Sequence, residues 1–403
     1  MNVINAERAV RERLLGLDLL RALAAWLVLL SHVAFWTGAV ADGVLGGLAV
    51  RGELGVAVFF ALSAFLLSAP FVRRGLSLPA AWHAETYLLR RAARILPAYL
   101  LALLAVVVAA AVIGGAAATV LDGPTVLVHL VIGQGWTGRT FQSFTQTWSL
   151  TTEVTFYLVL PVAALVLAPL MKGASPAASA RRMLGLCAAV AVGGLLTQGL
   201  AALVDDPRWG GVLATSAAGH AAWFALGAAI RVLVEAERAG TPVSTRPWIE
   251  ALRTSPGTLL VLAGVLWLVV ATPVAGPRGL DPASAAEAVA AEVLYGLVAG
   301  CLLLATLTRG LNDVLVTSAV AGPARWLGDI SYAVFLWHVL VLQVTFAVLD
   351  LRLFSAPFAP TLVLVTVVSV GLAHLSWTLV ERPVLARVHR RRVAPAPQPA
   401  ARG

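Results

Sequence analysis

The most informative feature of this sequence is how little charge it carries. Only 12% of its 403 residues are Asp, Glu, Lys or Arg, whereas 60% are hydrophobic. The mean hydropathy is +0.88. A soluble domain of this length would have about a quarter charged residues. The composition therefore excludes an ordinary soluble enzyme and indicates a protein embedded in a lipid bilayer.

Lysine and cysteine are also scarce. Lys172 is the only lysine, so the net charge of +9 comes almost entirely from arginines, and these border the apolar segments. The positive-inside rule for membrane proteins explains such arginines better than a nucleic-acid partner, which we do not expect. Cys187 and Cys301 both lie within apolar runs, which argues against a disulfide framework.

About ten apolar segments are long enough to cross a bilayer, which takes about 20 residues. They are centred on 17–37, 54–72, 95–117, 148–170, 183–204, 212–233, 257–275, 286–308, 326–348 and 361–381. The loops between them are alternately rich in arginine and in aspartate, and an even number of spans with both termini in the cytoplasm satisfies this alternation. The sequence predicts an all-α polytopic membrane protein with about ten transmembrane helices and cytoplasmic N and C termini.

The expected domain organisation is simple. Residues 1–16 form a cytoplasmic N-terminal segment, residues 17–383 form one transmembrane domain, and residues 384–403 form a Pro/Ala-rich cytoplasmic tail that we expect to be disordered. We find no internal repeat of the kind from which many secondary transporters are built.

The first span contains two ionisable side chains on one helix face. Arg21 and His32 are eleven residues apart, which places them about 16 Å apart along a helix axis. Asp18 precedes Arg21 by three residues and is within pairing distance. An ionisable group deep in a membrane marks a functional site by default. The alternative is that His32 only hydrogen-bonds a neighbouring helix, and this span alone leaves both interpretations open.

Two further spans carry polar side chains at helical spacing. In the fourth span, Ser149, Glu153 and Tyr157 share one face, and Trp148 precedes them at the expected interface. An intramembrane carboxylate such as Glu153 favours a pathway or catalytic role. In the ninth span, Ser331 and His338 are seven residues apart and also share a face. For His338 a structural and a functional role remain equally open.

Three arginines precede the core of the third span. Arg90, Arg91 and Arg94 lie on the side predicted to be cytoplasmic. They can serve simply as a membrane anchor. They can also bind an anionic cofactor, because guanidinium groups grip phosphates through two parallel hydrogen bonds.

The order of these motifs is similar to that of a known family. The pair Arg21-x10-His32 is followed by GVAVFFALSAFLL, RRAARILPAY, TWSLTTEVTFYLVLP, ISYAVFLWH and VERP. This series resembles the membrane acyltransferase-3 family, which contains polysaccharide and macrolide O-acyltransferases. The likeness extends from residue 16 to about residue 383. Leu19 and Ala64 stand where family sequences usually have glycine, and neither change removes a polar group.

The resemblance implies an O-acyltransferase that uses acyl-CoA, most simply acetyl-CoA, as a cytoplasmic co-substrate. It implies that Arg90, Arg91 and Arg94 hold the CoA phosphates and that His32 acts as general base or transient acyl carrier. Arg21 would orient the donor, and Glu153 would set the protonation of the site or position the acceptor. Ser149, Trp148, Tyr157, His338 and Ser331 would line the substrate site. We expect no metal and no permanently bound cofactor.

The expected partners are the lipid bilayer, acyl-CoA and an acceptor hydroxyl. That acceptor is an envelope or exported glycan, a glycolipid or a macrolide-type metabolite, and the expected location is the bacterial cytoplasmic membrane. The rival interpretation is a proton-coupled secondary transporter or lipid flippase, in which His32, Glu153 and His338 relay protons. It accounts for the intramembrane ionisable groups but not for the arginine cluster together with the motif series.

Overall fold

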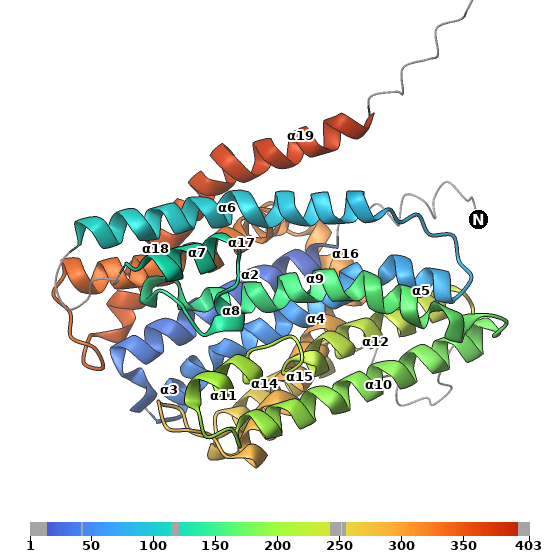
Figure 1. Ribbon diagram of the computed structural model, residues 1–403, viewed down its shortest axis with the longest axis horizontal. Coiled ribbons are helices and arrows are strands. Elements are labelled where there is room, and N and C mark those ends of the chain that lie inside the picture. Colours follow the sequence, from blue (N-terminus) through green and yellow to red (C-terminus); the bar gives the residue numbers. More distant parts are fainter. Residues whose placement is uncertain (1–13, 42, 114–120, 242–250, 252–254, 394–403) are drawn as a thin grey trace, which may run out of the picture.

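The structure is a computed structural model that describes residues 14–41, 43–113, 121–241, 251 and 255–393. These residues form helices, and they contain no β-strand. Figure 1 shows the long helices running side by side in one bundle. The predicted all-α fold is therefore confirmed.

Each predicted span corresponds to one helix. In chain order these are α2 (Leu15–Thr37), α4 (Gly55–Leu67), α6 (Ala84–Val112), α9 (Trp148–Leu167), α10 (Pro176–Ala201), α12 (Ala221–Arg238), α14 (Pro256–Val270), α15 (Ala285–Leu307), α17 (Ala321–Val348) and α18 (Phe358–Ser376). Within the described part of the chain, 8 helical stretches are long and apolar enough to cross a membrane. Helices α12 and α14 fall outside that set, and α14 is apolar but short.

Shorter helices connect these spans. They are α3 (Gly43–Val50), α5 (Ala69–Gly75), α7 (Gly123–Leu130), α8 (Gln134–Thr137), α11 (Pro207–Ala214) and α16 (Arg309–Thr317), with single 3-10 turns between some of them. A π-helical turn (Trp377–Glu381) follows α18 and leads into α19 (Arg382–Val393). The expectation that the tail is disordered from residue 384 is therefore wrong as far as residue 393. The rest of the tail and residues 1–13 lie outside the described part.

Helix α2 lies at the centre of the bundle, where it packs against α17, α4, α15 and α18. Close approach is possible because small residues face it. A methyl group at Gly52 or Gly55 would collide with the backbone carbonyls of Leu27 and Ala24, respectively. A methyl group at Gly328 of α17 would lie 2.6 Å from Cβ of Asp18. Small residues commonly allow membrane helices to approach in this way.

The outer helices expose apolar side chains instead of burying them. Helix α9 exposes Val162 and Val166 to 61% and 69%, and α10 exposes Leu196 to 63%. Apolar surface of this extent is typical of a face that contacts lipid. The outer face of the bundle is thus suited to contact lipid.

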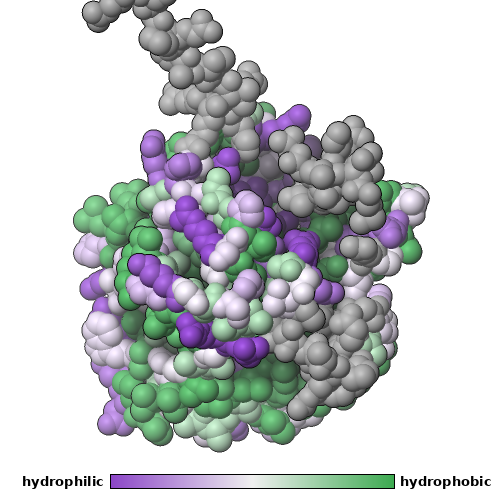
Figure 2. All heavy atoms as spheres, turned by 90° about the vertical axis from the view of Figure 1, so that its right-hand side faces the viewer, coloured by the Kyte–Doolittle hydropathy of each residue, from purple (hydrophilic) through white to green (hydrophobic). Residues whose placement is uncertain are grey.

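The two ends of the bundle differ. At one end α2, α6, α10 and α17 begin, and α4, α9 and α12 finish; we call it the arginine end, because most arginines of the connecting segments lie there. Figure 2 looks at this end, and hydrophilic side chains gather there while hydrophobic ones surround them. The other end, where α3, α11 and α15 begin, is called the far end below.

Candidate active site

His32 lies in the part of α2 nearer the far end, and its backbone contact defines its tautomer. Its Nδ1 is 2.8 Å from the carbonyl oxygen of Val28, one helical turn earlier. A carbonyl oxygen can only accept a hydrogen bond, so Nδ1 carries the hydrogen and donates it. The other ring nitrogen, Nε2, is then left with a lone pair, which a general base needs.

His338 of α17 lies beside His32. Its Nε2 is 3.4 Å from Nδ1 of His32, and the two rings meet edge to face with centroids 5.0 Å apart. Nδ1 of His338 is 3.3 Å from the carbonyl oxygen of Val334, so this nitrogen also carries the hydrogen. Nε2 of His338 therefore accepts from His32, which shares its N–H between Val28 and His338. The pairing of the first and ninth spans holds the His32 ring in one orientation.

The surroundings of His32 keep part of its surface accessible, whereas His338 is fully buried. Glu53, at the start of the second span, interacts electrostatically with His32. The Tyr295 hydroxyl donates to Glu53 at 2.5 Å, and the Arg51 guanidinium lies 3.6 Å from the same carboxylate. Sequence spacing does not predict this arrangement, because Arg51 and Tyr295 are far apart along the chain.

Arg21 points along the same face of α2 as His32, closer to the arginine end. Its Nη1 donates to Oδ1 of Asp18 at 3.0 Å, which confirms the pairing predicted from their spacing. Asp18 is completely buried, whereas the Arg21 side chain keeps 28% of its surface accessible. The partly accessible guanidinium therefore rests on a buried counter-ion.

Glu153 is the centre of a second polar group. Its Oε1 accepts hydrogen bonds from the Ser63 hydroxyl at 2.5 Å and from the Tyr157 hydroxyl at 2.6 Å. The Arg91 guanidinium lies over the Tyr157 ring, 5.8 Å from its centre. The contact between Glu153 and Tyr157 follows from their spacing on α9, but the partnership with Ser63 of α4 does not.

The packing of α4 on α2 locates Glu153 along the bundle relative to His32. Gly55 packs on Ala24 of the antiparallel α2, and Ser63 is eight residues beyond Gly55 toward the arginine end. His32 is eight residues beyond Ala24 in the opposite direction. Glu153 therefore belongs to the arginine end, and it does not border a site above His32.

This position arises because α9 begins inside the bundle. Its first residue, Trp148, packs on Phe60 and His220, with ring centroids 6.3 Å and 5.4 Å apart. The segment before it also reaches the interior, where Gln146 Nε2 donates to the carbonyl of Leu336 at 2.9 Å. Ser149 is buried and donates back to Gln146. Trp148 thus lies inside the bundle and not at the interface, where the sequence analysis had placed it. Neither Trp148 nor Ser149 is brought to His32.

Arg94 lies one helical turn beyond Arg91 and is surrounded by aromatic rings and a carboxylate. Its guanidinium is 5.9 Å from the centre of the Tyr332 ring and 5.5 Å from that of Trp377. Its Nη1 lies 4.0 Å from Oε2 of the buried Glu381. Tyr332 also interacts electrostatically with Glu153 and Tyr157, so the Arg91 and Arg94 groups are neighbours. Arg90, by contrast, is exposed.

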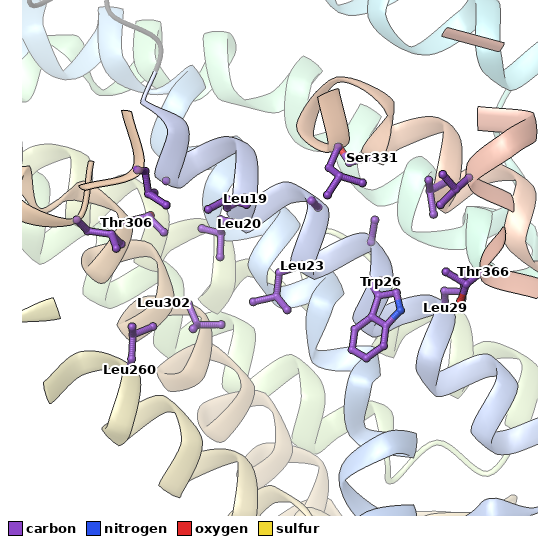
Figure 3. Close-up of a pocket in the computed structure, with 18 residues that line it drawn as sticks. Leu19, Leu20, Leu23, Trp26, Leu29, Leu260, Leu302, Thr306, Ser331 and Thr366 are labelled. Carbon is purple, nitrogen blue, oxygen red and sulfur yellow. The ribbon is translucent and has the colours of Figure 1, made fainter. Parts of the chain in front are cut away.

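Ser331 belongs to a different place. It lines an apolar pocket of about 560 Å³ on the side of α2 that faces away from Arg21 and His32. Figure 3 shows this pocket, where Leu19 and Leu23 of α2 lie toward Leu302 and Thr306, and Trp26 lies further along α2, near Leu29 and Thr366. The shared face of Ser331 and His338 therefore does not bring them into one site. Among the described residues no group of three or more His, Cys, Asp or Glu side chains could hold a metal ion.

A comparison with family models identifies the chain. The model described as an acyltransferase domain, of the acyltransferase-3 type, matches residues 14–377. The chain belongs to the acyltransferase-3 family. No curated protein and no solved structure matches it.

Membership in the acyltransferase-3 family makes this chain a multi-pass membrane acyltransferase, as its motif series had indicated. The structure places the candidate site residues of this acyltransferase in two sets. Near the far end are His32, His338 and Glu53, and at the arginine end are Arg91, Arg94, Glu153 and Glu381. Arg21 lies between the two sets, on the face of α2 that carries His32.

Proposed function

We propose that this acyltransferase transfers an acyl group from acyl-CoA, in the simplest case acetyl-CoA, to a hydroxyl of a sugar-containing acceptor. The donor binds at the arginine end, which faces the cytoplasm of a bacterial cell. The acceptor is an envelope or exported glycan, a glycolipid or a macrolide-type metabolite, and it reaches His32 from the far end. The positive-inside rule supports this orientation, because the arginines gather at one end.

The observation that carries the proposal is the separation of the two sets of residues. Arg91 and Arg94 can grip phosphates through paired hydrogen bonds, which arginine forms better than any other side chain. They lie with Glu153 at the arginine end, and Tyr332, beside Arg94, precedes His338 by six residues, or about 9 Å along α17. A small acyl phosphate could not occupy both places at once. Acyl-CoA carries its phosphates at one end and its thioester at the end of a long flexible arm, so it suits both.

His32 supplies the base in this mechanism. Its Nε2 takes the proton from the acceptor hydroxyl, while the hydroxyl oxygen attacks the thioester carbonyl carbon. The new C–O bond forms, the C–S bond breaks, and the CoA thiolate receives the proton from Nε2. A positioned base of this kind contributes about 10²–10⁴-fold to the rate. His338 accepts from Nδ1–H and stabilises the imidazolium that His32 becomes during the transfer.

The other groups position the donor. Glu153 and Ser63 hold the Tyr157 ring, on which Arg91 rests. Arg21 lies between the phosphate site and His32, with its guanidinium partly accessible and supported by Asp18. Bringing donor and acceptor together at fixed geometry lowers the barrier by several kcal/mol or more.

Inverted membrane vesicles that contain the protein provide the test, because they expose the cytoplasmic face to added substrate. With radiolabelled acetyl-CoA we expect release of CoA thiol together with label in the glycan or glycolipid fraction. Vesicles with His32→Ala serve as the matched control and should give neither. Intact wild-type protein that releases no thiol and labels no acceptor would contradict the proposal and favour a transporter or flippase.

A further inference from the structure

The carboxylate beside Arg94 has fewer partners than its position demands. Glu381 is completely buried at the π-helical turn that ends α18. Its Oε1 accepts one hydrogen bond, from the Ser376 hydroxyl at 3.3 Å. Its Oε2 is buried and has no hydrogen-bond partner. A buried carboxylate oxygen without a partner costs free energy, so its retention calls for a physical reason.

The nearest cation to this oxygen is Arg94. Nη1 of Arg94 lies 4.0 Å from Oε2, which is close enough for an ion pair but too long for a hydrogen bond. The guanidinium is held between Tyr332 and Trp377, and 28% of the Arg94 side chain remains accessible. Arg94 thus has a counter-ion on its buried side and can still meet a ligand on its accessible side.

The π-helical turn brings two contacts of Arg94, Trp377 and Glu381, together. Trp377 and Glu381 begin and end this turn, and the backbone N–H of Arg382 donates to the carbonyl of Trp377, five residues earlier. Pro383, which follows, has no N–H to continue the ordinary α-helical pattern. Single π turns of this kind occur often at functional sites.

We propose that Glu381 is an exchangeable counter-ion, which neutralises Arg94 in the empty enzyme and competes with the phosphates of the donor. This inference rests on the proposed function, since it assumes that Arg94 binds acyl-CoA. Before the donor binds, Glu381 is the charge that Arg94 faces. When the phosphates arrive, their hydrogen bonds are stronger than a pair at 4.0 Å, and Arg94 turns toward them. Glu381 thereby weakens donor binding and favours release of the CoA product.

Removing the charge of Glu381 should tighten the binding of acetyl-CoA, whereas loss of a purely structural residue would weaken it. Glu381→Gln removes the negative charge that repels the phosphates bound to Arg94. Coulomb repulsion between neighbouring charges is substantial at the effective dielectric of a protein. We expect Glu381→Gln to bind acetyl-CoA about tenfold more tightly than the wild type, which corresponds to about 1.4 kcal/mol. A variant that merely damaged the site would bind acetyl-CoA more weakly.

The experiment measures binding of acetyl-CoA to the detergent-purified full chain by calorimetry at pH 8. Arg94→Gln should weaken binding, and Glu381→Gln combined with Arg94→Gln should bind no more tightly than Arg94→Gln alone, because the competition requires Arg94. The matched control is Arg382→Gln, which changes the exposed sequence neighbour and should leave the affinity unchanged.

The outcomes are distinct. Tighter binding that depends on Arg94 supports the counter-ion, whereas equal or weaker binding by Glu381→Gln overturns it. If Glu381→Gln does not yield folded protein, Glu381→Asp, which draws the carboxylate away from Arg94, should also tighten binding, and unchanged or weaker binding again overturns the inference. A wild-type protein that binds no acetyl-CoA refutes the proposed function itself, and the inference with it.

Discussion

His338 is the residue whose role the structure defines most sharply beyond the sequence motifs. Replacing it by alanine removes the acceptor for the Nδ1–H of His32 but leaves the hydrogen bond from that N–H to Val28. His32 therefore keeps its tautomer in the ground state. The substitution destabilises the protonated form of His32, because the imidazolium then has no lone pair of His338 to accept its Nδ1–H.

The size of this effect follows from the geometry. A hydrogen bond to a charged group contributes about 1.5–3 kcal/mol. The separation of 3.4 Å between the two nitrogens is longer than a typical N–H hydrogen bond. We therefore take the lower value, about 1.5 kcal/mol, which corresponds to about a tenfold lower kcat. Donor binding should not change, because the affected charge develops only in the transition state.

The assay is the initial rate of acetyl transfer from acetyl-CoA in vesicles, together with acetyl-CoA binding by the purified protein. His338→Gln keeps an acceptor oxygen and should recover part of the rate. Leu336→Ala is the control, because it creates a cavity at a fully buried position of the same helix without touching His32. A wild-type kcat for His338→Ala, or an equal loss in Leu336→Ala, would refute the reasoning.

Three further predictions test the donor site, the topology and the packing. Arg91→Gln with Arg94→Gln should raise the Kd for acetyl-CoA, by about 1.5–3 kcal/mol for each lost phosphate contact, whereas the exposed Arg90→Gln should not; equal effects would reduce all three to membrane anchors. Reporter fusions after residues 40, 206 and 350 should report outside and those after 85, 175, 315 and 395 inside, and an inside signal at 206 would break the ten-span arrangement. Gly227→Ala should lower the free energy of unfolding by about 1–3 kcal/mol, because its methyl group would collide with the Ala61 carbonyl. Gly264→Ala, which meets open space, should not, and equal melting temperatures of the two variants would contradict the packing.

The sequence predicted the features that depend on local spacing. Hydrophobic length located the long helices, because a membrane span needs a continuous apolar run, and 8 helical stretches of the described residues are long and apolar enough to cross. The pair of Asp18 and Arg21 and the pair of Glu153 and Tyr157 were found in the same way, since residues three or four apart share a helix face.

The features that depend on which helices touch could not be predicted. His32 and His338 are 306 residues apart in the sequence, and Ser63 and Glu153 are 90 apart. Glu381 is likewise buried beside Arg94, which is 287 residues away in the sequence.

The level at which α9 begins could not be predicted from the sequence either. An apolar run shows that a segment is embedded but not at which level it begins. The segment before α9 enters the bundle, so Trp148 and Glu153 lie closer to the arginine end than their distance from the preceding loop suggested. The proposed function therefore gives Glu153 a role on the donor side.

The central claim is that His32 is the base of the transfer reaction. The most direct measurement is the initial rate of acetyl transfer by His32→Gln, compared at equal protein level with the wild type. Glutamine can still donate a hydrogen bond to Val28 but cannot take up the acceptor's proton. We expect a loss of about 10²–10⁴-fold with acetyl-CoA binding nearly intact. Turnover close to that of the wild type would show that His32 only orders the helices, and would contradict the account.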